Sequence, residues 1–351
     1  MLLSALALAA PCCSAPTGPT RPIPTLTATA ADFNQTAWPF SGAYLANGFV
    51  GLRVGPRALV RDPWAGATAP ASLGNAMPVE STLVGGYLML DHEVKGAPTP
   101  MNQSDGIDTY APAPFPFETE VLVTPEHGPS FRLSEASPPR PSDWMDQGGF
   151  EKLAKNGSEF ITVVNQTLAM GVGELTTHLR IAPPTGEWAL ELEVTQFLSR
   201  SMPSLALQRV RARATPPTLR FSLQPLLTTD GLCTAAGCAA YHNTIPMRNH
   251  WGYGHPVGVG MRTNMGARLV LAVQSMCNGD DVDTDYQQSQ AQPCAHPAAT
   301  KPEKAGSFPP GTLEMDTFVA IVSDVYHARP SVVSRAILLA SGLHSSKECQ
   351  Q

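Results

Sequence analysis

The sequence predicts a mainly β protein, built as a large antiparallel β-sandwich with a short C-terminal helix. Apolar and polar residues alternate with a period of two through the middle of the chain, which places them on opposite faces of a strand. Proline (34) and glycine (29) are abundant, as is typical of many short strands joined by turns. No helical pattern of 10–15 residues separates these segments, which disfavours a parallel α/β architecture.

The alternation is clearest where Trp188, Leu190 and Leu192 fall on one face of a predicted strand and Glu191 and Glu193 on the other. Turn formers such as Pro and Gly bound each segment of this kind. Strands with one dry and one wet face indicate antiparallel sheets that pack face to face. The segments that alternate in this way are 175–181, 187–195, 209–214 and 219–224.

More uniformly apolar segments predict the central strands of the same sandwich. These segments are 49–54, 269–273 and 318–322. After Pro330, apolar residues recur at three- and four-residue spacing, which predicts a linker helix over 329–345. Three long Pro- and Gly-rich connections are expected to be surface loops. They cover 65–84, 96–116 and 228–260.

Composition excludes two classes of function. Charged residues make up 15% of the chain and the formal net charge is -6. This balance offers no basic surface for nucleic acid or for an anionic membrane surface. We therefore expect neither partner, no membrane span and no cofactor.

The amino terminus predicts secretion, to the outside of the cell or to the lumen of the secretory pathway. Residues 1–16 contain a short apolar stretch followed by small residues, as in a signal peptide. Four acceptor sequons for N-glycosylation support the same route. They begin at Asn34, Asn102, Asn156 and Asn165.

The cysteines agree with an oxidising compartment. Removal of the leader, which contains Cys12 and Cys13, leaves five cysteines. Two disulfides are expected, with Cys349 left over. The expected pairs are Cys233 with Cys238 and Cys277 with Cys294. No CxxC pair occurs, so no metal site is expected.

Four stretches, taken in order, resemble the amino-terminal supersandwich domain of glycoside hydrolase family 65. They are YLANGFVGLRVG (44–55), GELTTHLRI (173–181), VTQFLSRSMPSLALQRVRA (194–212) and FVAIVSDVYHARPSVVSRAILLASG (318–342). The family includes acid trehalase, disaccharide phosphorylases and the protein-glucosylgalactosylhydroxylysine glucosidase. The resemblance implies a β-sandwich domain over 17–328 that leads through the linker helix into an (α/α)6 barrel.

In this family the barrel supplies the acid that protonates the leaving oxygen, and hydrolases add a second carboxylate that activates water. The sequence ends at Gln351, where the resemblance places the start of the barrel, so no catalytic residue is carried over. The resemblance implies an α-glucoside ligand and a barrel in cis or in trans. Two other functions stay open: a free-standing secreted carbohydrate-binding module, and an extracellular structural protein.

Residues 242–258 form the most distinctive loop, since exposed aromatic faces suit sugar rings and histidine can bind or transfer protons. Its candidate sugar contacts are His250, Trp251, Tyr253 and His255. The alternative is that the aromatic residues only pin a turn-rich loop.

Other polar candidates have simpler interpretations. Two glutamate pairs are expected on solvated outer faces, and two arginines are expected to satisfy strand or turn carbonyls. An acidic loop lacks the glycine and glutamate of a calcium-binding EF-hand. These residues are Glu191 with Glu193, Glu118 with Glu120, Arg53, Arg200, and the loop residues Asp281, Asp283 and Asp285.

Overall fold

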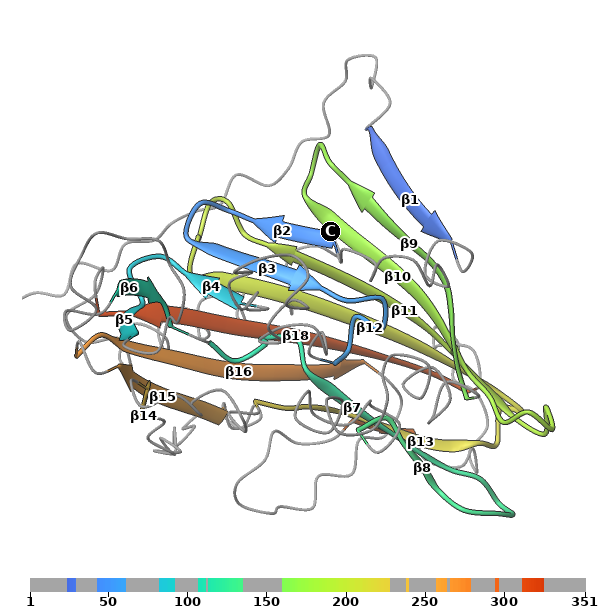
Figure 1. Ribbon diagram of the computed structural model, residues 1–351. Helices are drawn as coiled ribbons and strands as arrows, with labels where there is room; N and C mark the ends of the chain where they lie inside the picture. The colour runs from blue at the N-terminus through green and yellow to red at the C-terminus, as the bar shows by residue number, and fades with distance from the viewer. Residues whose placement is uncertain are drawn as a thin grey trace, which may run out of the picture.

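The protein is described by a computed structural model, in which every regular element within the described residues is a β-strand. All strand pairs are antiparallel, so the mainly β, antiparallel character that the sequence predicts is confirmed, and the strands pack in layers as expected for a sandwich (Figure 1). The described residues are 24–29, 43–60, 82–91, 107–111, 113–134, 160–227, 238–239, 257–263, 266–278, 294–296 and 311–324.

The main layer is a sheet of nine strands in the order β1-β9-β10-β11-β12-β18-β16-β15-β14. Neighbouring strands from β9 to β12 are also neighbours in sequence, whereas β18 inserts between β12 and β16. The strands are β1 (Thr25–Thr29), β9 (Ile161–Ala169), β10 (Glu174–Ile181), β11 (Ala189–Leu198), β12 (Leu205–Thr215), β14 (Cys238–Ala239), β15 (Val257–Thr263), β16 (Arg268–Asn278) and β18 (Thr312–Ser323).

Three smaller sheets complete the structure, and in Figure 1 the β2–β4 sheet lies across the long central strands. Their orders are β17-β13-β7-β8, β2-β3-β4 and β5-β6. The strands are β2 (Ala43–Ala46), β3 (Val50–Val54), β4 (Thr82–Val84), β5 (Leu88–Asp91), β6 (Ile107–Tyr110), β7 (Thr119–Thr124), β8 (Phe131–Arg132), β13 (Arg220–Pro225) and β17 (Cys294–His296).

One face of the large sheet, which we call the inner face, contributes to a single hydrophobic core. Leu192, Ala212 and Leu313 lie side by side on β11, β12 and β18, and each is almost fully buried. The same core contains Leu52 of β3 and Val121 of β7, so the smaller sheets pack on this face. The dry faces predicted for 187–195 and 209–214 are confirmed.

Buried glutamines tie the second layer to the inner face. Gln166 of β9 donates to the carbonyl of Gly55 (3.2 Å). Gln196 of β11 donates to the carbonyl of Ala58 (2.8 Å), in the irregular segment after β3. Gln208 donates to the carbonyl of Phe117 (3.0 Å), just before β7. Because a buried carbonyl without a partner is destabilising, these side chains hold non-strand backbone against the sheet.

Asn47 connects two of the stretches on which the family resemblance was based. Its Oδ1 accepts from the amides of Phe49 (3.0 Å) and Val50 (2.8 Å), which shapes the turn between β2 and β3. Its Nδ2 donates to the carbonyls of Ser199 (2.9 Å) and Pro203 (2.8 Å), between β11 and β12. The two stretches are therefore joined through one side chain.

The structure corrects two predictions. Segments expected to be loops contain strands: β4 lies within 65–84, β6 within 96–116, and β14 and most of β15 within 228–260. Glu120 was expected on a solvated face but is 9% exposed, and its carboxylate accepts from the amide of Ser134 (3.1 Å). The reason is local: the chain that follows β8 brings the Ser134 amide onto this carboxylate, whereas Leu122 and Thr124 further along the same face are only half-buried.

Several predictions fall outside the described residues and stay predictions. They are the signal peptide, the helix over 329–345, the sequons at Asn34, Asn102 and Asn156, the loop residues His250, Trp251, Tyr253 and His255, and Cys233 and Cys349. In the part of the chain that is described, no helix is long and apolar enough to cross a membrane. Nor do these residues contain a group of three or more His, Cys, Asp or Glu side chains placed to hold a metal ion.

Candidate functional site

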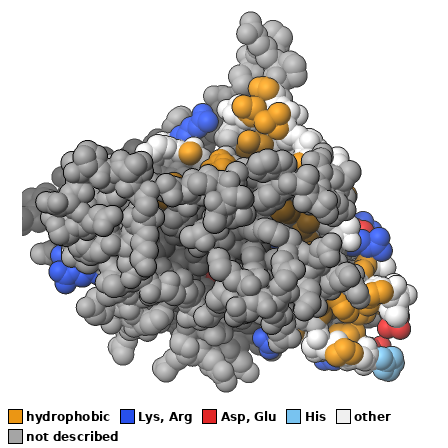
Figure 2. All heavy atoms as spheres, in the orientation of Figure 1, with side chains coloured by type: hydrophobic (Ala, Val, Ile, Leu, Met, Phe, Trp, Pro, Cys, Tyr) orange, Lys and Arg blue, Asp and Glu red, His pale blue; other side chains and the backbone are white. Residues whose placement is uncertain are grey.

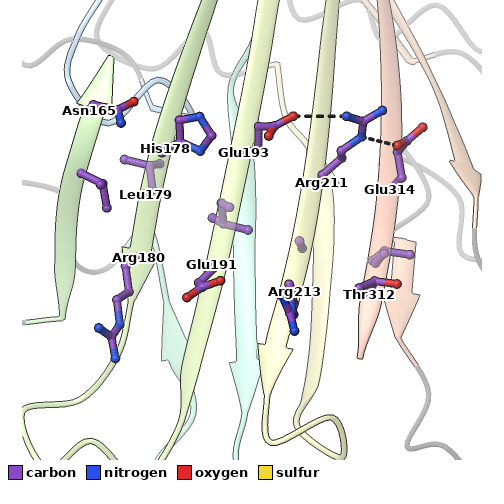
Figure 3. A pocket seen from close by; sticks show the side chains of 14 residues that line it. Asn165, His178, Leu179, Arg180, Glu191, Glu193, Arg211, Arg213, Thr312 and Glu314 are labelled. Carbon is purple, nitrogen blue, oxygen red and sulfur yellow. Dashed lines mark hydrogen bonds and ion pairs between the residues drawn. The ribbon is translucent and has the colours of Figure 1, made fainter. Parts of the chain in front are cut away.

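The outer face of the large sheet, opposite the core, carries polar side chains in rows that run across the strands. Asn165, His178, Glu193, Arg211 and Glu314 are partners of one another on successive strands from β9 to β18. Two residues further along lies a second row, formed by Arg180, Glu191, Arg213 and Thr312. Figure 3 shows both rows, with the side chains on the same side of the sheet. Together they line a groove of about 600 Å³.

The first row is held by ion pairs. Arg211 donates from Nε to Glu314 (2.6 Å) and from Nη1 to Glu193 (3.2 Å), as the dashed lines in Figure 3 mark. The neighbouring Arg209 binds Asp316 through two hydrogen bonds, of 2.7 and 3.0 Å. Hydrogen bonding to Glu314 raises the pKa of Arg211, and hydrogen bonding to Asp316 raises the pKa of Arg209. Both guanidinium groups therefore stay charged and fixed in place.

The carboxylates of this network are more buried than their partners. The Glu314 and Asp316 side chains are 10% and 12% exposed, while those of Arg211 and Arg209 are 53% and 45% exposed. Removal of an arginine would leave a largely desolvated carboxylate without its partner. A buried charge without a partner strongly destabilises the folded state. The network is therefore structural, and it forms one rigid side of the groove.

Three residues of the second row lack such ion pairs. Within the described part of the chain, Arg180, Glu191 and Arg213 make no ion pair or side-chain hydrogen bond with protein groups, although they occupy neighbouring strands. His178 of the first row is likewise without a protein partner among these residues. Guanidinium groups donate only, a carboxylate accepts, and an imidazole can do both. The groove therefore presents both kinds of hydrogen-bonding capacity to an incoming molecule.

Two acids of the groove, Glu191 and Glu193, come from one strand and do not face one another across it. Glycoside cleavage uses two carboxyl groups that flank the scissile bond. Glu191 and Glu193 lie on the same face of one strand (Figure 3). Glu193 also binds Arg211. The arrangement suits binding better than proton transfer to a bond held between two acids.

A different surface lies at the β1 edge of the same sheet. Figure 2 shows hydrophobic side chains gathered near this edge. Leu26, Met170 and Val172 are 60%, 51% and 55% exposed, at β1 and at the turn between β9 and β10. This apolar edge contrasts with the polar rows on the outer face.

Part of the site could be predicted and part was missed. The polar face predicted for the segment around Glu191 and Glu193 is confirmed. Asn165, predicted as a glycosylation site, lies in β9 at the side of the groove. Glu314 and Asp316 were missed because the strand was expected to begin at residue 318. The alternation of Leu313 and Met315 with these acids was the signal that could have placed them.

The remaining predicted residues are placed as follows. Cys277 is disulfide-bonded, while the Cys294 and Cys238 side chains are outside the described residues, so both predicted pairings stay predictions. Arg53 is buried in β3. Arg200 is exposed, and its guanidinium lies over Gly173 at the turn before β10.

Comparisons with known proteins bear on the fold. No family model matches the sequence, and no curated protein does. Seventeen chains of solved structures match the fold. One of them, named "Putative kojibiose phosphorylase from human microbiome", has a TM-score of 0.51 and 12% sequence identity. The match covers 87% of this chain and 33% of that one, so the chain spans about a third of the length of this relative. At this identity the likeness shows the fold alone, which is similar to part of a protein from the family that the sequence resembles.

Proposed function

We propose that this chain is the non-catalytic amino-terminal sandwich region of a secreted, family 65-type protein that acts on α-glucosides. The observation that carries the proposal is the unequal coverage of the structural likeness, 87% of this chain against 33% of the phosphorylase chain. The order of the four similar stretches, two of which are joined by Asn47, supports the same assignment.

In this proposal the sandwich is a scaffold, and the chemistry belongs to an (α/α)6 barrel in cis or in trans. An inverting mechanism needs two carboxyl groups roughly 6.5–9.5 Å apart on opposite sides of the sugar. Glu191 and Glu193 lie on the same face of one strand, and Glu193 is engaged by Arg211, which supports the assignment of catalysis to another part of the protein.

The experiment is a turnover assay on the purified chain. Kojibiose, maltose and trehalose are incubated with it, with and without inorganic phosphate, and glucose and glucose 1-phosphate are measured. We expect no release above that of a buffer control. Release of either product by the pure chain would overturn the proposal.

A further inference from the structure

We infer that the unpartnered part of the outer-face groove, formed by His178, Arg180, Glu191 and Arg213, binds a neutral oligosaccharide laid across the strands. The inference depends on the proposed function for the class of ligand, since a region of a carbohydrate-active protein meets glycans. It goes further by assigning a site on the sheet itself, formed by residues other than the four that the sequence predicted as sugar contacts.

The spacing of the polar side chains favours a ligand that crosses the strands. Neighbouring strands in a sheet lie about 4.8 Å apart, and residues two positions apart on a strand are separated by about 6.8 Å. Arg180, Glu191 and Arg213 occupy three successive strands at one level, and His178 stands at the next level. A ligand that crosses the strands therefore meets one polar side chain on each, in a groove of about 600 Å³. That volume is within the range of small-molecule sites, about 300–1,000 Å³.

Two neighbouring arginines of the groove differ in their partners. Arg211 and Arg213 are two residues apart on β12 and face the same way, but Arg211 has two carboxylate partners and Arg213 has none among the described residues. An ordered network beside free hydrogen-bonding groups is a preorganised arrangement, because the supporting residues do not have to rearrange when a ligand binds.

The hydrogen-bonding groups of the groove match the hydroxyls of a neutral sugar. Each sugar hydroxyl can donate and accept, and so it can satisfy both Glu191 and the guanidinium groups on either side of it. A phosphate or sulfate could bind the two arginines only next to the carboxylate of Glu191, which would repel it. The exposed side chain of Val164, on the same groove, offers an apolar contact for the C–H face of a sugar ring.

The test is calorimetric titration of the full chain with maltohexaose and kojibiose, and with inorganic phosphate as a comparison. Arg213→Ala and Glu191→Gln should each weaken oligosaccharide binding by about tenfold, because each removes a charge-assisted hydrogen bond. Arg220→Ala, an exposed arginine of β13 in another sheet, is the matched control and should leave the affinity unchanged. Circular dichroism checks that each variant is folded.

Three results would overturn the inference: no heat with either oligosaccharide, equal affinities for the Arg213 and Arg220 variants, or tighter binding of phosphate than of oligosaccharide. Each of these leaves the proposed function standing, because that function fails on turnover and not on binding. Conversely, turnover by the pure chain together with a loss of binding in the Arg213 variant would refute the non-catalytic role and support the site.

Discussion

At the scale of single residues, Asn47 shows how one side chain can fix the distance between two parts of the chain. It uses both ends of its amide: Oδ1 shapes its own turn, and Nδ2 reaches the turn between β11 and β12. The two Nδ2 bonds are therefore what links the two turns.

Asn47→Ala is expected to destabilise the protein by about 2 kcal/mol, because four hydrogen bonds are lost at a partly buried position. Asn47→Asp keeps the acceptor for the local turn but places a carboxylate against the carbonyls of Ser199 and Pro203. It should therefore destabilise the protein at least as much. Urea unfolding monitored by tryptophan fluorescence measures both effects. If Asn47→Asp left the free energy of unfolding unchanged, only the local turn would contribute to stability.

The ion pairs of the outer face give a second test at this scale. Arg209→Ala should lower the free energy of unfolding by about 1–2 kcal/mol, because Asp316, 12% exposed, loses two hydrogen bonds, while the 45% exposure of Arg209 limits the effect. Arg213→Ala, on the same strand and face, should change it by less than about 0.5 kcal/mol. Thermal unfolding of the two variants side by side makes the comparison, and equal effects would contradict the structural role of the network.

At the scale of elements, β18 shows where prediction from the sequence succeeds and where it stops. Residues 318–322 are apolar enough to predict a buried central strand, and β18 does lie between β12 and β16. Its first half carries Glu314 and Asp316, which are buried and bind arginines of β12. Those pairings join residues about a hundred positions apart, so local patterns could not reveal them.

The short strands illustrate the same limit. β4 and β6 contain three and four residues, which is too few for a period to stand out from a Pro- and Gly-rich background. By contrast, the ten or eleven residues of β11 and β12 alternate along their length, and their faces could be predicted correctly.

The entry into β18 depends on one glycine. Gly311 has a φ of +77°, and a Cβ there would lie 2.8 Å from the Cα of Pro217 and 3.1 Å from the carbonyl oxygen of Ala214. Gly311→Ala should destabilise the protein by about 3 kcal/mol, since backbone strain and a clash with backbone atoms add together.

Gly186 is the matched control for that substitution. Its φ is +72°, but a Cβ there meets nothing within 4 Å. Gly186→Ala should thus lower the free energy of unfolding only through the strain of a left-handed backbone, by about 1–2 kcal/mol. Differential scanning calorimetry on both variants separates the two contributions, and an equal loss of stability would argue against the close approach at Gly311.

At the scale of the whole molecule, one hydrophobic core includes residues of the large sheet and of the β2–β4 and β7–β13 layers. Alternation predicted which side chains face this core. It could not predict which polar side chains meet on the opposite face, because that depends on strand order. The groove appears only once β18 takes its place beside β12 and the register of Arg211 with Glu314 is fixed.

This division gives the molecule two different faces. The inner face is filled by the smaller sheets and by glutamines that bind their backbone. The outer face carries a small buried apolar cluster around Phe318, a locked ion-pair network and free hydrogen-bonding groups. We therefore assign support to the inner face and ligand contact to the outer face, and bond cleavage to neither.

The most direct test of that division is an NMR time course of ¹³C-labelled kojibiose mixed with the pure protein and inorganic phosphate, because one spectrum reports both binding and chemistry. We predict that the sugar signals broaden in proportion to protein concentration while no signal of glucose or glucose 1-phosphate grows in over a day. Product signals that increase with time, and that disappear for Glu191→Gln, would contradict the account.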